Sequence, residues 1–597
     1  MNKRFSSRYI VGLFWLVVAV AIALYMHIKH RYHFPFIEQS QMFLFDKAYI
    51  VDKLCQVAGV ATLVEEFFTQ FFVLPFVGPL FVAVALVAVG LLARSIVKRV
   101  APTVDAPLVW LLPVALQLYT MVDYDYQYSG IIAYIMALAT FRLYIAVADW
   151  RYKTLLASVL ALVLYWFAGP AALMFVLGIV AYELCSAPRW GVAYSLIPMV
   201  VVAAAGWVAV YYMHLVGEVR YAFLPDLYYK PMLRPSSDIY YAWAVLPLIC
   251  AVAPLLRRCK EPKAGLKRVV GVAQIVCVAL LVVLLGKDKE YLQPSVTKFK
   301  EMDYHLRFEQ WDDLLALSRE QGVDNALHIM MQNIALIQKD ALGDEAFAYT
   351  QAGLDGITMD WSDNNPFIFS MLSDLHFALG NTSISQEVAF KKNSESIAVN
   401  HSYNPRMLKR LIQTNIIYGG ESGYAVAEKY ISILEKSLFY AEWATAQRAL
   451  LGNDDLLEPM MLEQRVNMHN IDLTYKMDGN FDILGDVAHC NLSRRTFHHQ
   501  CAGYLLNMDL ERFYQIVSRL YGTESMPTLP KSFAEALLIY AAQNQLDVEG
   551  YSIDENTKRS FMEFQTFAAK NYNNRNLASI MRKSYSETYW YYYMFTK

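Results

Sequence analysis

Residues 71–93 read FFVLPFVGPLFVAVALVAVGLLA, an apolar run without a charged side chain that ends at Arg94. A helix needs about 20 mostly apolar residues to cross the hydrocarbon core of a bilayer, so this run predicts a membrane span. Similar runs fill the first half of the chain, and together they predict nine spans: 9–28, 71–93, 106–122, 128–148, 154–168, 171–187, 191–214, 239–256 and 269–286. We therefore expect an all-α chain whose residues 1–286 form a polytopic transmembrane domain.

Two of these assignments depend on local detail. Residues 154–168 and 171–187 are short for spans, and Gly169-Pro170 between them fits either a tight hairpin or a kink in one re-entrant element. The run 9–28 follows a basic start, as the core of a signal peptide does. It is longer than such a core and no small-residue cleavage site follows it, so we interpret it as a retained first span.

Charge predicts the orientation of the spans. The connections on the side of the N-terminus carry roughly twice as many lysines and arginines as the longer connections on the other side. Since cytoplasmic connections carry the excess of positive charge, we expect a cytoplasmic N-terminus and residues 287–597 on the outer side. The chain lacks the cysteine density of a disulfide scaffold, which favours the inner membrane of a bacterium with two membranes and a periplasmic C-terminal domain.

The C-terminal half, residues 287–597, contains weakly similar helical segments. The segments 328–339, 367–380 and 407–420 begin about 40 residues apart, and each is followed by a second amphipathic segment, at 345–354, 385–392 and 424–436. This pattern resembles a degenerate tetratricopeptide-type array, which implies an α-solenoid. Such a solenoid presents a concave surface to partner proteins, or else packs on the outer face of the membrane domain. Cys490 and Cys501 in this half are either a disulfide or two independent thiols.

Short polar stretches in the outer connections are the candidate chemistry of the chain. Lys29 and Arg31 follow the first span directly, where they either hold a lipid phosphate or anchor the helix among headgroups. Glu38 lies farther along the same connection. The short second outer connection contains Asp123 and Asp125, which are either a site for a divalent cation such as Mg²⁺ or Mn²⁺ or solvated turn residues.

The order of these features resembles the GT-C superfamily of membrane glycosyltransferases, which use sugars linked to polyprenyl phosphates. The resemblance covers about residues 1–130 and concerns topology alone. It implies that Glu38 or Asp46 supplies the acid of the first outer loop, and that Asp123 and Asp125 supply the acidic pair of the second. The acids would act as general base and metal ligands, with Lys29 and Arg31 on the lipid phosphate.

The remaining observations define the alternatives. The net charge of −2 gives no attraction to nucleic acid, and no phosphate-binding loop indicates an ATP-driven transporter. Membrane lipids are the expected surroundings of the first half. The enzyme hypothesis predicts sugar transfer to a periplasmic acceptor. The alternative is a membrane-anchored scaffold without enzyme activity, which recruits partners for envelope assembly or secretion through its helical repeats.

Overall fold

The computed structural model describes residues 2–102, 107–147, 149–186, 189–230, 233–257, 293–358, 366–400, 402–467 and 492–596, with a few isolated positions between them. Every regular element in these residues is a helix, and the described strand-type contacts are isolated bridges. The predicted all-α class is therefore confirmed. The chain forms two compact units, which are described separately.

Unit 1 comprises Met1–Thr297 together with Ser396–Tyr403 and Lys436–Phe439, two short segments from the C-terminal half of the chain. Four of its helical stretches are long and apolar enough to cross a membrane: Tyr9–Lys29, Val77–Val100, Gly191–Tyr211 and Ser237–Arg257. They belong to α1 (Asn2–Lys29), α5 (Val77–Val100), α10 (Arg189–Tyr211) and α12 (Ser237–Arg257). The length and composition of these helices indicate a membrane-associated protein.

Four more apolar helices in unit 1 are shorter than a full span. They are α6 (Leu111–Val122), which follows the 3-10 turn η2 (Pro107–Trp110), α7 (Ser129–Tyr144), α8 (Trp150–Ala168) and α9 (Ala171–Ser186). The predicted ninth span, 269–286, lies largely outside the described residues. The structure thus contains four helices of spanning length in its described part, fewer than the sequence predicted.

The turn between α8 and α9 resolves one open alternative. Gly169 has φ +57°, and the Ala172 N–H donates to the Gly169 carbonyl at 3.1 Å. A β-carbon at Gly169 would approach Leu227 to 2.9 Å, so both the backbone angle and the space favour glycine. Residues 150–186 therefore form two helices joined by a tight hairpin.

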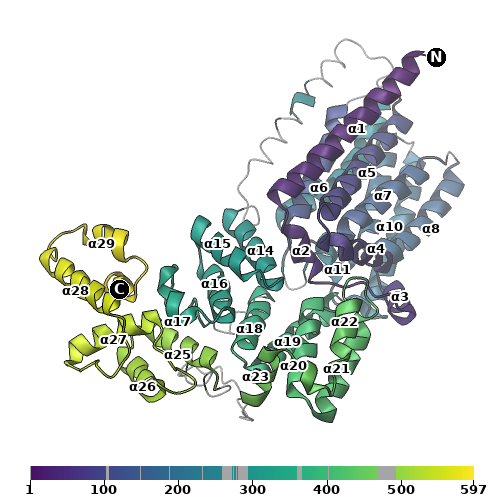
Figure 1. Ribbon diagram of the computed structural model, residues 1–597. Helices are drawn as coiled ribbons and strands as arrows, with labels where there is room; N and C mark the ends of the chain where they lie inside the picture. Colours follow the sequence, from purple (N-terminus) through teal and green to yellow (C-terminus); the bar gives the residue numbers. More distant parts are fainter. Residues whose placement is uncertain are drawn as a thin grey trace. The chain divides into compact units, whose positions relative to one another are not determined.

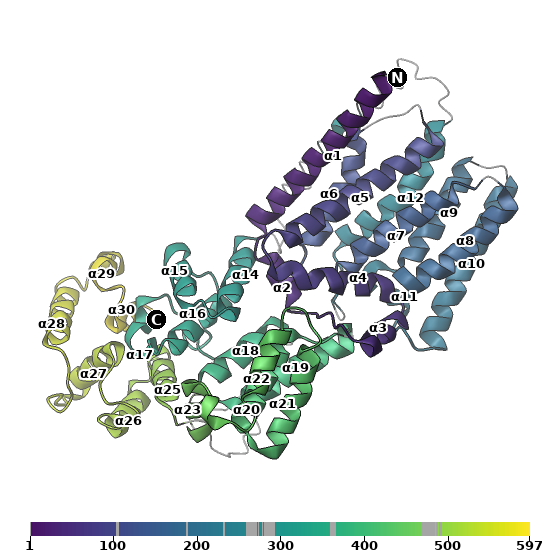
Figure 2. The same cartoon turned by 45° about the vertical axis from the view of Figure 1, so that its right-hand side comes forward.

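Three short helices lie between α1 and α5: α2 (His33–Glu38), α3 (Lys47–Leu54) and α4 (Gly59–Thr69), followed by the 3-10 turn η1 (Gln70–Val73). They lie at the end of unit 1 opposite the N-terminus, and α4 runs across the helix bundle (Figure 2). The α4 helix packs on α7 and α8. This end also carries α11 (Val219–Phe223) and the 3-10 turn η3 (Pro225–Tyr228).

Unit 2 contains helix pairs of the kind that the repeat pattern predicts. Its first part holds most of α14 (Pro294–Arg307) and α19 (Thr382–Asn400), whose ends belong to unit 1. It also holds α15 (Trp311–Gln321), α16 (Ala326–Gln338), α18 (Pro366–Ala378), α20 (Pro405–Tyr418) and α21 (Gly420–Leu434) (Figure 1). The second helix predicted at 345–354 is wrong. Only α17 (Leu342–Glu345) and the 3-10 turn Ala346–Ala348 form there, because the backbone becomes extended at Tyr349 with φ −117° and ψ 156°.

The C-terminal part of unit 2 consists of short helices: α22 (Ala441–Arg448), α23 (Pro459–Asn467), α25 (Arg494–Leu506), α26 (Leu510–Leu520), α27 (Lys531–Asn544), α28 (Glu555–Lys570), α29 (Leu577–Tyr585) and α30 (Tyr589–Phe595). Tyr589 and Trp590 are buried in the core of unit 2. Cys501 is a buried free thiol, whereas Cys490 lies outside the described residues.

Candidate functional site: the acidic connections of unit 1

The first connection, residues 30–76, is attached to the second connection, residues 123–128, through α2. His33 Nε2 lies 3.1 Å from the Met121 carbonyl oxygen and 3.1 Å from the Tyr128 hydroxyl oxygen. The rings of Phe36 and Tyr124 meet edge to face with centroids 6.1 Å apart. Glu38, which is buried, ends the same short helix two residues after Phe36.

Glu65 joins the same two connections from α4. Its Oε1 accepts a hydrogen bond from the Tyr128 backbone N–H at 2.6 Å, at the position that precedes the first residue of α7. The carboxylate therefore caps the N-terminus of α7 from another element, where the helix dipole favours negative charge. The other oxygen, Oε2, is buried and has no hydrogen-bond partner.

Burial sets the protonation of Glu65. Loss of hydration raises the pKa of this carboxyl to about 7, and hydrogen bonds from Gln41 and Ser129 oppose the rise. The neighbouring Glu66 carboxylate adds repulsion in the same upward direction. Glu65 is therefore a buried acid that changes charge near neutral pH.

Glu66, the next residue, is part of a buried ion pair. Its Oε1 lies 2.7 Å from Lys53 Nζ, and both side chains are fully shielded from solvent. Tyr49 donates its hydroxyl proton to the other carboxylate oxygen, and its hydroxyl oxygen lies 3.1 Å from the Met42 carbonyl oxygen. Such a pair needs these extra hydrogen bonds, because burying two charges costs several kcal/mol.

Two segments from the C-terminal half complete this part of unit 1. The Ser402 hydroxyl accepts the Met42 N–H at 2.9 Å and lies 3.2 Å from the Met42 carbonyl. The Lys436 carbonyl accepts the Phe45 N–H at 2.8 Å, and its ammonium pairs with Asp46 at 3.1 Å. The stretch between α2 and α3 is thus held by residues more than 350 positions away.

The second connection pairs with the loop between α11 and α12. Gln127 N–H donates to the Tyr228 carbonyl at 2.8 Å, and Lys230 N–H donates to the Asp125 carbonyl at 2.9 Å. Asp123 accepts the Tyr229 hydroxyl at 3.1 Å. Burial raises the pKa of Asp123 to about 6, so this acid also titrates above its usual range.

Asp125 forms an ion pair with a lysine side chain of the protein. Its Oδ1 lies 2.8 Å from Lys230 Nζ, while its backbone N–H donates to Asp123 Oδ1 at 3.0 Å. The two carboxylates are therefore close in the chain but have different partners. No group of three or more His, Cys, Asp and Glu side chains in the described residues could hold a metal ion.

The structure brings together only some of the predicted site residues. It brings Glu38, Asp123 and Asp125 to interlocked connections at one end of unit 1. It leaves Lys29 and Arg31 exposed beside the end of α1, and it uses Asp46 as the N-cap of α3, where its carboxylate accepts the Tyr49 N–H.

No role for Glu65 or Glu66 was predicted from the sequence. Their sole signal is a pair of acids in an otherwise apolar stretch. Their partners lie in distant segments, so spacing could not assign them a role.

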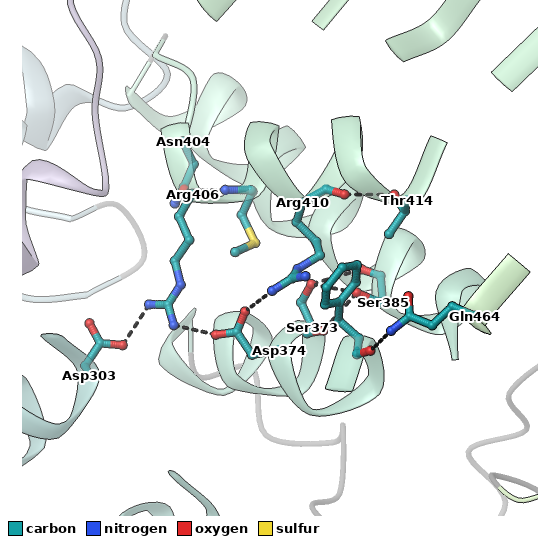
Figure 3. A network of polar contacts seen from close by, with 11 residues as sticks. Asp303, Ser373, Asp374, Ser385, Asn404, Arg406, Arg410, Thr414 and Gln464 are labelled. Carbon is teal, nitrogen blue, oxygen red and sulfur yellow. Dashed lines mark hydrogen bonds and ion pairs between the residues drawn. The ribbon is translucent and has the colours of Figure 1, made fainter. Parts of the chain in front are cut away.

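Unit 2 has a separate charged cluster, shown in Figure 3. Arg406 Nη1 pairs with Asp303 at 2.7 Å and its other end nitrogen pairs with Asp374. Arg410 reaches Asp374 at 2.8 Å and lies over the Phe377 ring at 3.6 Å. Although burial opposes it, the two guanidinium groups hold the pKa of Asp374 below its usual value. Two arginines balance two aspartates here, and the cluster ties α14, α18 and α20 together.

Comparison with known proteins gives one result. No curated protein and no solved structure gives a significant match to the chain. One family model, described as a family of unknown function (DUF6057), matches residues 6–596. The match covers both units, including the acidic connections and the helix pairs, and the chain therefore belongs to this family.

Proposed function

We propose that this chain is a GT-C-like glycosyltransferase that moves a sugar from a polyprenyl-phosphate carrier to an acceptor in the periplasm. One observation carries the proposal. The first and second connections interlock through His33–Tyr128 and Glu65–Tyr128, so acidic residues from both gather at one end of the apolar bundle. The resemblance stated above implies such a gathering.

The chemistry we propose uses the chain's own groups. The Glu38 carboxylate accepts the proton of an acceptor hydroxyl, whose oxygen then bonds to the anomeric carbon of the sugar. The bond between that carbon and the phosphate oxygen breaks, and its electron pair leaves with the polyprenyl phosphate. Lys29 and Arg31 stabilise the departing phosphate from the end of α1.

A resident divalent cation fits this site poorly. Both oxygens of Asp123 already accept hydrogen bonds, and Asp125 is paired with Lys230. We therefore assign the predicted Mg²⁺ or Mn²⁺ no step. In this proposal Asp123 and Asp125 shape the second connection and hold Lys230 beside it.

Complementation tests the proposal. A strain that lacks the gene receives wild type, Glu38→Gln or the control Asp52→Asn, which changes an exposed acid of the same connection. We expect a glycan that is lost on deletion, restored by wild type and Asp52→Asn, and absent with Glu38→Gln at matched expression. Mass spectrometry of envelope glycans provides the readout, and an unchanged glycan profile on deletion would refute the transferase.

The finer topology belongs to the same proposal. We place the chain in the inner membrane with nine spans, a cytoplasmic N-terminus and unit 2 in the periplasm as a tetratricopeptide-like solenoid that selects the acceptor. The packing of α18 on α19 and of α20 on α21 supports the repeat. The basic ends of α5 and α12 support the orientation. Reporter fusions after residues 102 and 597 test the sidedness, since they should report opposite compartments.

One observation favours a second function. Asp123, Asp125 and Glu66 each have a fixed partner within the protein, as expected where acids serve structure rather than chemistry. A scaffold that recruits envelope-assembly or secretion partners through unit 2 would have this property. Full rescue by Glu38→Gln, together with capture of a defined partner by the full-length chain, would favour the scaffold over the enzyme.

A further inference from the structure

Helix α4 has an inverted distribution of buried and exposed side chains, and α3 shares it in part. Glu65 and Glu66, the charged residues of α4, are 1% exposed, and Lys53 of α3 is fully buried, whereas Lys47 and Asp52 of α3 are exposed. Large apolar residues of both helices also face outward. These exposed residues are Val51, Leu54, Phe67 and Phe68. A helix surrounded by water buries its apolar face and exposes its charges, so the reversed pattern of α4 indicates an apolar environment outside it. The exposed surface of α3 carries charged and apolar side chains together, as suits a helix at the level of lipid headgroups.

The same end of unit 1 carries a ring of exposed aromatic side chains. They stand where apolar helices begin or end: Phe76 before α5, Phe167 in the last turn of α8, Trp207, Tyr211 and Tyr212 at the end of α10, and Tyr241 in the first turns of α12. Such residues are enriched at the level of lipid headgroups, where their amphipathic rings meet both phases. These aromatic residues therefore indicate the position of a membrane boundary, and they do so independently of the side chains of α3 and α4.

Contacts within unit 1 fix α3 and α4 at the height of this ring. Trp166, next to Phe167 of the ring, donates its indole N–H to the Leu54 carbonyl at 3.0 Å. Its own carbonyl accepts the Ala58 N–H at 3.0 Å, between α3 and α4. Phe68 of α4 packs against Phe81 of α5 with ring centroids 5.3 Å apart. The exposed apolar surface thus continues from the long apolar helices onto α3 and α4.

We infer that the outward face of α3 and α4, formed by Val51, Leu54, Phe67 and Phe68, is a lipid-binding surface that rests at the headgroup–acyl boundary of the bilayer. The occupant is the membrane itself, because the face is apolar and continuous with surfaces of helices long enough to span one. Lys53, Glu65 and Glu66 then lie on the protein side of a thin apolar layer.

This inference does not require glycosyl transfer, and its test is physical. Spin labels are attached at Leu54→Cys and Phe68→Cys in the full-length chain, with the native cysteines replaced, in nanodiscs of phosphatidylethanolamine and phosphatidylglycerol. Collision rates with oxygen, which concentrates in lipid, and with Ni-EDDA, which stays in water, report the surroundings of each label. Val84→Cys on an exposed position of α5 gives the lipid reference, and Glu549→Cys on an exposed loop of unit 2 gives the aqueous reference.

We expect the labels at 54 and 68 to collide with oxygen several times more often than with Ni-EDDA, as at position 84. Rates like those at position 549 would overturn the inference. Cys55, an exposed native thiol beside Leu54, provides the measurement without a new residue if Leu54→Cys fails to fold. The two proposals can fail separately. Lipid-like collision rates at positions 54, 55 and 68, together with an unchanged glycan profile on deletion, would support the lipid-binding surface and refute only the glycosyltransferase.

Discussion

The Glu65 carboxylate caps helix α7 by accepting the Tyr128 backbone N–H at 2.6 Å, across 63 positions of sequence. This single contact joins the first connection of the membrane unit to the second. The second carboxylate oxygen of Glu65 is buried without a hydrogen-bond partner. The contact between the two connections therefore depends on one side chain, whose charge changes near neutral pH.

Replacing this acid tests the cap. Glu65→Ala leaves the Tyr128 N–H buried without an acceptor, and we expect the free energy of unfolding to fall by about 2 kcal/mol. Glu65→Gln keeps an acceptor oxygen and should lose less. Thermal unfolding in detergent measures both, and equal losses in the two variants would show that the hydrogen bond contributes little.

The stability that Glu65 contributes should depend on pH. Because its pKa is raised from 4.5 to about 7, the stabilisation is complete below pH 4.5 and is lost as pH rises through 7. The difference in unfolding free energy between wild type and Glu65→Gln should therefore change by up to about 3 kcal/mol between pH 4.5 and 8. Other titrating groups are common to both proteins and cancel, so a constant difference would contradict the expectation.

The Lys53–Glu66 pair should show strong coupling. Lys53→Met leaves a buried carboxylate without its cation and should lower the unfolding free energy by about 3 kcal/mol. The double variant Lys53→Met/Glu66→Gln should lose less than the sum of the two single changes. Lys47→Met, an exposed lysine of the same helix, is the control and should have little effect. Additive losses would mean that the two charges do not act as a pair.

Ser402 should hold the segment between α2 and α3. Without its hydroxyl, Met42 loses the acceptor of its N–H, and hydrogen exchange of the amides in residues 39–46 should accelerate several-fold in Ser402→Ala. Mass spectrometry of the full-length chain measures this exchange. Ser518→Ala, at an exposed serine of unit 2, is the matched control. Unchanged protection in Ser402→Ala would show that other contacts suffice.

Unit 2 should lose stability in acid. Burial lowers the pKa of His498 to about 4, so its contribution is complete above pH 6.5 and is lost as pH falls toward 4. We expect His498→Phe to reduce this loss by up to about 3 kcal/mol. Hydrogen exchange of α25 in the full-length chain gives the readout at pH 6.5 and 4.5, corrected for intrinsic exchange. Equal acid sensitivity of both proteins would assign the effect to other groups.

Local pattern predicted most helices because apolar runs and helical spacing are properties of neighbouring residues. The starts of α16, α18 and α20 fall within two residues of the predicted repeat positions. The pattern failed where the local backbone decides: the helix expected over 345–354 ends after Ala348, because Tyr349 is extended.

The candidate site was less predictable for a different reason. Asp123 and Asp125 stand out in the sequence, but their partners Tyr229 and Lys230 come from a loop more than 100 positions away. Glu66 depends on Lys53 and on Ser402, which no spacing rule connects. Sequence identified acids in the connections, and only tertiary structure shows which of them are paired.

The return of Ser396–Tyr403 and Lys436–Phe439 to unit 1 limits how this protein can evolve. A gene fusion that exchanged everything after Thr297 for another domain would also remove Ser402 and Lys436. The amides of Met42 and Phe45 would then lose their acceptors. The two halves are interleaved rather than joined in tandem, so no single recombination breakpoint transfers one of them intact.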